Sequence, residues 1–139
     1  MANLSVEIKR TNQKVHFEGV SDLNPGISIP FDFAPPLGDG AGFGGLELLL
    51  MSFAGCASTT IVFLLGRAGK QLTAYSATAE GTRTERPLSL SEIHLHMRIE
   101  SEDITAADME TALAQAEAMA PVWQALKNNV AIKISFELL

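Results

Sequence analysis

The sequence has little cysteine, few aromatic residues and no concentration of positive charge. Cys56 is the only cysteine in 139 residues. An internal disulfide is therefore impossible, and we expect a protein of a reducing compartment, the cytoplasm. The ten Lys and Arg residues are scattered and the net charge is −6, which argues against nucleic acid as a partner. The first ten residues lack a basic segment followed by an apolar one, so we expect no signal peptide.

One long apolar run, residues 46–65, has about the length that crosses a bilayer. It contains Glu47, Ser52 and three further hydroxyl residues, and no positive cluster flanks either end. A helix that is apolar on nearly all sides is more typical of the buried centre of a globular protein or of a dimer. We therefore expect no membrane insertion.

Hydrophobic periodicity predicts nine elements in a single domain, residues 1–139. A helix is expected over 45–68, ending at Gly69, and a capping box of Thr105 and Asp108 is expected to open a second helix. Pro121 is expected in the first turn of a short third helix that ends near residue 127. The predicted strands cover 4–8, 15–20, 27–33, 72–86 with a bulge at Gly81, 92–100 and 130–138.

This order predicts an α+β protein with antiparallel β-sheets packed on a long central helix. Most neighbouring strands have no helix between them, which favours antiparallel pairing. The helix over 45–68 would be about 35 Å long, which is long for a domain of this size. Because it is apolar on most sides, we expect a second copy to cover it, so the predicted assembly is a homodimer.

Two motifs argue weakly for a bound cofactor or metal. Residues 40–45 match GxGxxG, but no Asp or Glu occurs between Leu48 and Ala79, where a dinucleotide site would need one. His94 and His96 share the polar face of a predicted strand, but a tight metal site needs three or four ligands. We expect surface histidines, no metal and no cofactor.

Cys56 is the residue with the strongest claim to chemistry. A cysteine in an apolar helix is most often a small buried hydrophobic residue. However, Gly55 precedes it at a cost of about 1 kcal/mol in a helix, which favours close approach of another element. Ser52, Ser58 and Thr59 add hydroxyl groups nearby, and we expect these to bond helix carbonyls or pack against neighbours.

The segment from Gly44 to Cys56, GGLELLLMSFAGC, resembles the OsmC/Ohr family signature, a loop and a Glu-Leu-Leu-rich helix that bears the reactive cysteine. Residues 93–97 are similar to a strand of the subgroup called YhfA-like. Residues 116–126 are similar to the helix and turn where relatives carry a second cysteine. The resemblance implies an OsmC-like fold and an intertwined homodimer, with two long helices between sheets and a thiol site near the interface.

Characterised members of that family reduce organic hydroperoxides through a thiolate, whose sulfenic acid condenses with the second cysteine. By resemblance, Cys56 matches the attacking cysteine, and Cys56 and Glu47 are the candidate catalytic residues. The family's glutamate falls at Leu46, one residue before Glu47. The second cysteine falls at Ala120, so an external thiol reductant would have to resolve Cys56. Arg10 is the nearest candidate for the family's arginine, but no motif assigns it.

The sequence leaves three functions open. In the first, the protein is a one-cysteine peroxidase that acts on a small hydroperoxide through Cys56. In the second, it is a non-catalytic OsmC-like dimer that binds a small apolar molecule or holds a redox-sensing thiol. In the third, the dimer is purely structural. The exposure of Cys56 and the approach of a guanidinium to its sulfur are the features that distinguish them.

Overall fold

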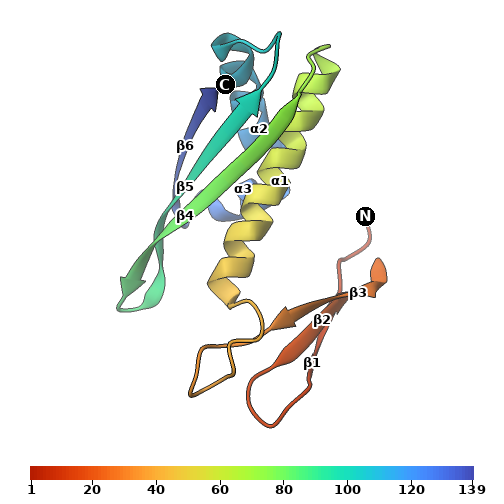
Figure 1. Cartoon of the computed structure of the whole chain (residues 1–139), viewed down its shortest axis with the longest axis vertical. Coiled ribbons are helices and arrows are strands. Elements are labelled where there is room, and N and C mark those ends of the chain that lie inside the picture. Colours follow the sequence, from red (N-terminus) through yellow and green to blue (C-terminus); the bar gives the residue numbers. More distant parts are fainter. The chain divides into compact units, whose positions relative to one another are not determined.

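A computed structural model describes all residues, 1–139. The chain divides into two compact units, Met1–Leu48 and Leu49–Leu139. The first unit holds β1 (Val6–Arg10), β2 (Phe17–Ser21) and β3 (Asn24–Phe31), which are red to orange in Figure 1. α1 (Gly45–Arg67) begins in the first unit and continues into the second, which also holds β4 (Ala74–Glu85), β5 (Leu88–Glu100), α2 (Ala106–Met119), α3 (Pro121–Leu126) and β6 (Ala131–Leu138). That the chain acts as one domain stays a prediction.

The first unit is an antiparallel sheet in the order β1-β2-β3. The side-chain oxygen of Asn12 shapes the loop between β1 and β2, because it accepts the backbone N–H groups of Lys14 (2.9 Å) and His16 (3.1 Å). Val6, Ile8 and Ile27 of this sheet are between 63% and 73% exposed. Such exposure of large apolar side chains leaves the sheet with an apolar face that the first unit itself does not cover.

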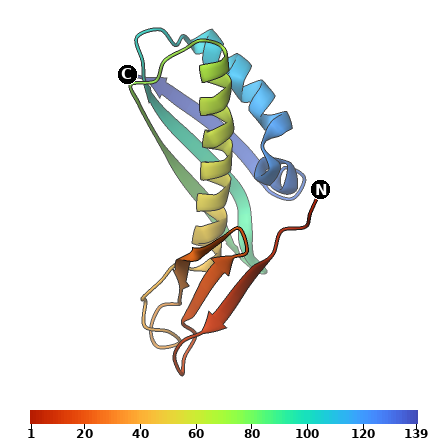
Figure 2. The same ribbon diagram turned by 90° about the vertical axis from the view of Figure 1, so that its right-hand side faces the viewer.

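The second unit packs α1, α2 and α3 on one face of the sheet β4-β5-β6 (Figures 1 and 2). Alternate side chains of β5 point to the helices: Ile93, Leu95, Met97 and Ile99 are fully buried. The intervening His94 and Arg98 lie on the opposite, polar face. The predicted strand with one dry face and one wet face is therefore confirmed.

The pairing of the last strand differs from the antiparallel expectation. β4 and β5 form an antiparallel hairpin, but β5 and β6 run parallel. A parallel return requires a crossover connection, and α2 and α3 provide it. The α+β class is confirmed, and β5–β6 is the one parallel pair in it.

The prediction of a bulge at Gly81 is wrong. The register of β4 against β5 shifts between Thr82 and Arg83 instead. Gly81 has a packing role, since a Cβ built there would lie 2.8 Å from a methyl carbon of Leu90 and 3.3 Å from one of Leu50.

The predicted helix ends are confirmed. Gly69 has φ 79°, and the N–H of Lys70 donates to the carbonyl of Leu65 (3.0 Å), which closes α1 with a Schellman motif. Thr105 and Asp108 form both hydrogen bonds of a capping box at the start of α2.

α1 is long and apolar enough to cross a membrane by length and composition, with a mean hydropathy of 2.1 over 18 residues. Only 28% of that window is buried within the chain. The core helix of a soluble protein has the same length and hydropathy, so these two properties do not indicate a membrane span. The low buried fraction means that much of the apolar surface of α1 is exposed.

Candidate functional site

Cys56 lies in the middle of α1, at the border between a buried and an exposed stripe. Phe53 and Ala57, on one side of the helix, are fully buried against the rest of the second unit. Gly55 and Thr59, on the other side, are exposed, and Cys56 itself is half-buried. Cys56 is therefore neither a core residue nor a fully solvated one.

The hydroxyl groups near Cys56 bond the helix backbone or the sheet beneath it. Thr59 donates to the carbonyl of Gly55 (2.8 Å) and Thr60 donates to the carbonyl of Cys56 itself (3.1 Å). Ser58 shares a hydrogen bond of 2.7 Å with the hydroxyl of Tyr75 on β4. Burial raises the pKa of Tyr75 above its ordinary 10.0, and the bond to Ser58 partly offsets this. The predicted structural role of the hydroxyl groups is confirmed, and none of them bonds the sulfur.

An aromatic contact packs the buried side of α1 against α3. Phe53 meets the ring of Trp123 edge to face, with ring centroids 5.7 Å apart. Ala120, the last residue before α3, is fully buried, and its N–H donates to the carbonyl of Ala116 (2.8 Å). A methyl group thus occupies the position where the resemblance places a second thiol.

The exposed stripe of α1 is open at its centre. A Cβ built on Gly55 would have no atom within 4 Å, so no element of the second unit approaches this glycine as predicted. Met51 (47% exposed) and Phe63 (54%) lie on the same stripe. The guanidinium of Arg67 lies 5.7 Å from the centre of the Phe63 ring.

Glu47 and Arg10, the two other residues singled out from the sequence, are each bound locally. Glu47 accepts the N–H of Gly44 (2.9 Å) in the first turn of α1, nine residues before Cys56 and thus about 13 Å away along the helix. Arg10 donates to the carbonyls of Gln13 and Lys14, so it closes the β1–β2 loop. Neither side chain forms a hydrogen bond with the thiol.

The loop after β3 is organised by Asp32, a residue that the sequence analysis missed. Its carboxylate is 1% exposed and accepts the N–H groups of Phe33 (2.8 Å), Ala41 (3.0 Å) and Asp39 (3.3 Å). The bond from Ala41 is the main reason why the pKa of Asp32 lies below its ordinary 3.8; burial opposes this, and the other two N–H groups and the charge of His16 add to it. An Asp before a Pro- and Gly-rich segment was the available signal.

The glycines of this loop fit close packing, not a phosphate site. A Cβ on Gly38 would lie 2.2 Å from the carbonyl oxygen of Phe33 and 2.3 Å from a carboxylate oxygen of Asp32. A Cβ on Gly42 would lie 2.8 Å from the backbone of Pro30. The GxGxxG spacing therefore coincides with glycines that the tight fold of the loop requires.

Asp32→Asn is expected to lower stability in a pH-dependent way. Because the folded-state pKa is depressed, the contribution of the carboxylate is complete above about 3.8 and is lost as the pH falls through the lower folded value. Thermal melts from pH 2 to pH 7 should show the variant several degrees below the wild type near neutrality, with a gap that narrows progressively as the pH falls below about 3.8. Asp22→Asn, in an exposed turn, is the control. A constant gap at all pH values would contradict the assignment.

His94 and His96 lie on the outer face of the sheet and share one hydroxyl. The oxygen of Ser135 is 2.7 Å from Nε2 of His94 and 2.7 Å from Nδ1 of His96, and Nε2 of His96 is 3.2 Å from a carboxylate oxygen of Glu137. No three His, Cys, Asp or Glu side chains come together in a way that could hold a metal. The two histidines are therefore linked through Ser135 in a surface hydrogen-bond network.

Comparison with known proteins points to one family and one fold. A family model described as OsmC-like protein matches residues 38–135. No curated protein matches the chain in sequence. The solved OsmC like protein from Mycoplasma pneumoniae is 20% identical, with a TM-score of 0.85 and coverage of 99% of this chain and 98% of that one. A hypothetical protein from Aquifex aeolicus VF5 is 20% identical, with a TM-score of 0.84 and coverage of 100% and 98%.

Several similar structures have a functional name. An organic hydroperoxide resistance protein from Elizabethkingia anophelis is 15% identical to this chain, with a TM-score of 0.75 and coverage of 100% of this chain and 98% of that one. At such low identities these likenesses show the fold alone. They agree with the long helix and the two three-stranded sheets described above.

Proposed function

Because this chain belongs to the family of OsmC-like proteins, we propose that it reduces organic hydroperoxides through Cys56, with an external thiol as the reductant. The observation that carries the proposal is the half-exposed position of the only thiol in the middle of α1. The name of the Elizabethkingia anophelis structure supports the choice of substrate class. A fully buried cysteine would instead favour a structural role.

In the proposed reaction, the Cys56 thiolate attacks the outer oxygen of the hydroperoxide. The O–O bond breaks, the alcohol leaves with a proton, and the sulfur becomes a sulfenic acid. A small thiol then displaces water from the sulfenic acid and forms a mixed disulfide. A second thiol releases Cys56 and carries away the oxidised pair as a disulfide. The external thiol is needed because Ala120 supplies no sulfur.

A partner subunit completes the proposed site. Within the chain, no hydrogen bond reaches the sulfur, and Arg67, the only arginine on α1, lies over Phe63. A thiolate is favoured by a nearby cation or by directed hydrogen bonds. Since the stripe beside Cys56 is uncovered at Gly55, we propose that a second copy covers it and brings such groups to the sulfur.

The apolar surfaces of the chain support the homodimer. In the first unit, a groove of about 420 Å³ is lined mainly by apolar residues of all three strands, including Val6, Ile8 and Ile29. On α1, Val62 and Phe63 are 40% and 54% exposed. Exposed apolar surfaces of this kind are typical of an obligate interface. If the protein is monomeric, the groove is instead available to an apolar ligand, as the non-catalytic alternative requires.

Phe63→Glu is expected to prevent dimer formation, because it would bring a carboxylate into an apolar interface, where even pairing with Arg67 would not repay the lost hydration. Sedimentation velocity should show a dimer for the wild type and a monomer or unfolded chain for the variant. Phe63→Leu keeps an apolar side chain and should remain dimeric. A Phe63→Glu protein that sediments as a folded dimer would place this stripe outside the interface.

The proposed function is tested by trapping the sulfenic acid of Cys56 and by measuring peroxide consumption. The purified protein is mixed with an organic hydroperoxide such as cumene hydroperoxide and with a sulfenic acid trap, and the adduct is located by mass spectrometry. We expect one adduct per chain, at Cys56, and catalytic consumption of peroxide once a dithiol is added. A protein that forms no adduct and consumes no peroxide with any thiol would refute the proposal.

A further inference from the structure

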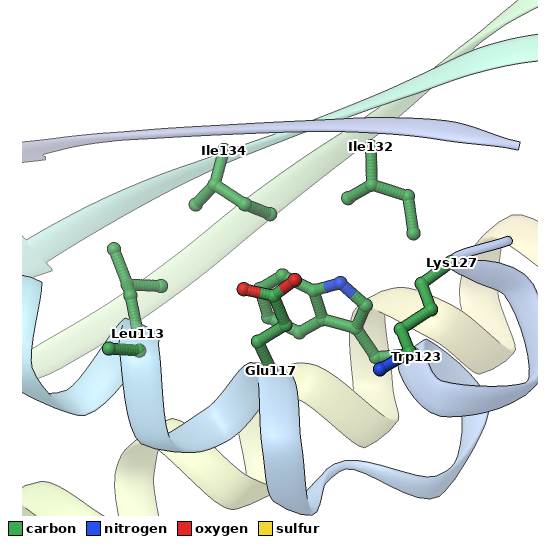
Figure 3. A pocket seen from close by; sticks show the side chains of 7 residues that line it. Leu113, Glu117, Trp123, Lys127, Ile132 and Ile134 are labelled. Carbon is green, nitrogen blue, oxygen red and sulfur yellow. The ribbon is translucent and has the colours of Figure 1, made fainter.

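A second, separate cavity lies between the helices α2 and α3 and the edge strand β6. It has a volume of about 270 Å³, enough for about nine water-sized groups. Figure 3 shows Leu113 and Glu117 on α2, the Trp123 ring in the middle, and Ile132 and Ile134 on β6. The walls are aliphatic and aromatic, and the charged groups are Glu117 and the Lys127 ammonium.

Trp123 presents to this cavity a hydrogen-bond donor that has no partner within the protein. The residue is 5% exposed, yet its indole N–H donates no hydrogen bond within the chain, whereas every side-chain nitrogen or oxygen without solvent contact has a partner. The indole nitrogen must therefore open onto accessible space, and the cavity is the space that Trp123 lines. An accessible donor of this kind can bond to a water molecule or to an acceptor on a ligand.

The two charged side chains of the cavity are also free. Glu117 lies on α2 and Lys127 directly follows α3; both are exposed, and neither takes part in an ion pair. The cavity thus offers one cation, one anion, one neutral donor and apolar walls. A purely apolar ligand would leave the indole N–H unpaired, and a simple anion would meet the repulsion of Glu117.

We propose that this cavity binds a small zwitterion with an apolar side chain, of the chemical class of the hydrophobic α-amino acids. The ligand carboxylate accepts from the indole N–H of Trp123 and pairs with Lys127. The ligand ammonium pairs with Glu117, and its side chain packs on Leu113 and Ile134. This site is additional to the proposed chemistry of Cys56 and does not depend on it.

Trp123 is the only tryptophan and it lines the cavity, so its fluorescence can report on binding there. L-Leucine titrated into the full-length protein should shift the emission with a saturable curve. The matched compounds 4-methylpentanoate, which lacks the ammonium, and 3-methylbutylamine, which lacks the carboxylate, should bind at least about tenfold more weakly, as loss of one ion pair would give.

Glu117→Gln should weaken leucine binding about tenfold and leave 4-methylpentanoate unchanged or tighter. Glu110→Gln, on an exposed face of α2 outside the cavity, should bind leucine like the wild type. The absence of a saturable response to leucine would overturn the proposal. The proposal would also be overturned if the wild type bound leucine and 4-methylpentanoate equally well and Glu117→Gln changed neither affinity. The site would then select an anion and not a zwitterion.

Discussion

Cys56→Ser is expected to abolish peroxide consumption by the protein completely and to leave its fold unchanged. A serine hydroxyl has nearly the shape of a thiol but cannot be oxidised to a sulfenic acid, and no other cysteine is present to replace it. The side chain is half-buried, so its exchange should change the free energy of unfolding by no more than about 0.5–1 kcal/mol. Peroxide consumption with a dithiol, measured beside circular dichroism, tests both parts.

The matched control for Cys56→Ser is Thr59→Ala, one turn away on the exposed stripe of the same helix. Its hydroxyl bonds only the carbonyl of Gly55, so peroxide consumption should persist. Turnover that survives in Cys56→Ser at the wild-type rate would exclude the thiol mechanism. A loss of activity in Thr59→Ala equal to that in Cys56→Ser would show that the helix surface, and not the sulfur, is what the assay measures.

Phe53→Ala is expected to lower the free energy of unfolding by about 3–5 kcal/mol, a large part of the stability of an ordinary domain. Phe53 is fully buried and meets Trp123 edge to face, so its removal leaves a cavity and ends an aromatic contact at once. Urea unfolding should show a much lower midpoint, and the Trp123 emission of the folded variant should shift because the ring loses its neighbour.

Phe63→Ala is the comparison for Phe53→Ala, since it makes the same change on the exposed side of the same helix. Phe63 is 54% exposed in the chain, so its effect should act through the dimer and should fade as the protein concentration rises. The effect of Phe53→Ala should persist at every concentration. Equal midpoints for the wild type and Phe53→Ala would place this side chain outside the core.

The parts of the fold that the sequence predicted correctly depend on local patterns. The alternation from Ile93 to Ile99 predicts one buried face, because successive side chains of a strand point to opposite sides. Thr105 and Asp108 are three residues apart, which is the spacing that a capping box needs. In both cases the physical cause lies within a few residues, so the sequence alone is sufficient.

The parts that sequence could not predict depend on contacts between distant segments. Alternation shows which face of β6 is buried but not its direction, and the parallel pairing with β5 follows from the crossover through α2 and α3. The helix over 45–68 is apolar on most sides, but Met51 and Phe63 on it are 47% and 54% exposed. A period of 3.6 residues cannot distinguish the core of one chain from the interface with another.

The sequence predicted some residues of the candidate site and missed others. Cys56 was found because it is unique and because the residues around it resemble a family signature. Asp32 was missed, because its three N–H partners lie up to nine residues later in the chain and converge only when the loop folds. The cavity at Trp123 was missed for the same reason, since two helices and a strand contribute its walls.

A half-exposed thiol with no second cysteine in its chain also has a consequence for protein taken directly from cells. Its sulfenic acid cannot form a disulfide within the chain, so under the proposed mechanism Cys56 carries first one added oxygen and then the reducing thiol as a mixed disulfide. The intact mass of the rapidly acidified protein would then exceed that of the bare chain by the mass of that thiol less two hydrogen atoms. The physiological reductant would thus be identified as a covalent adduct, before any reductant is tested in vitro.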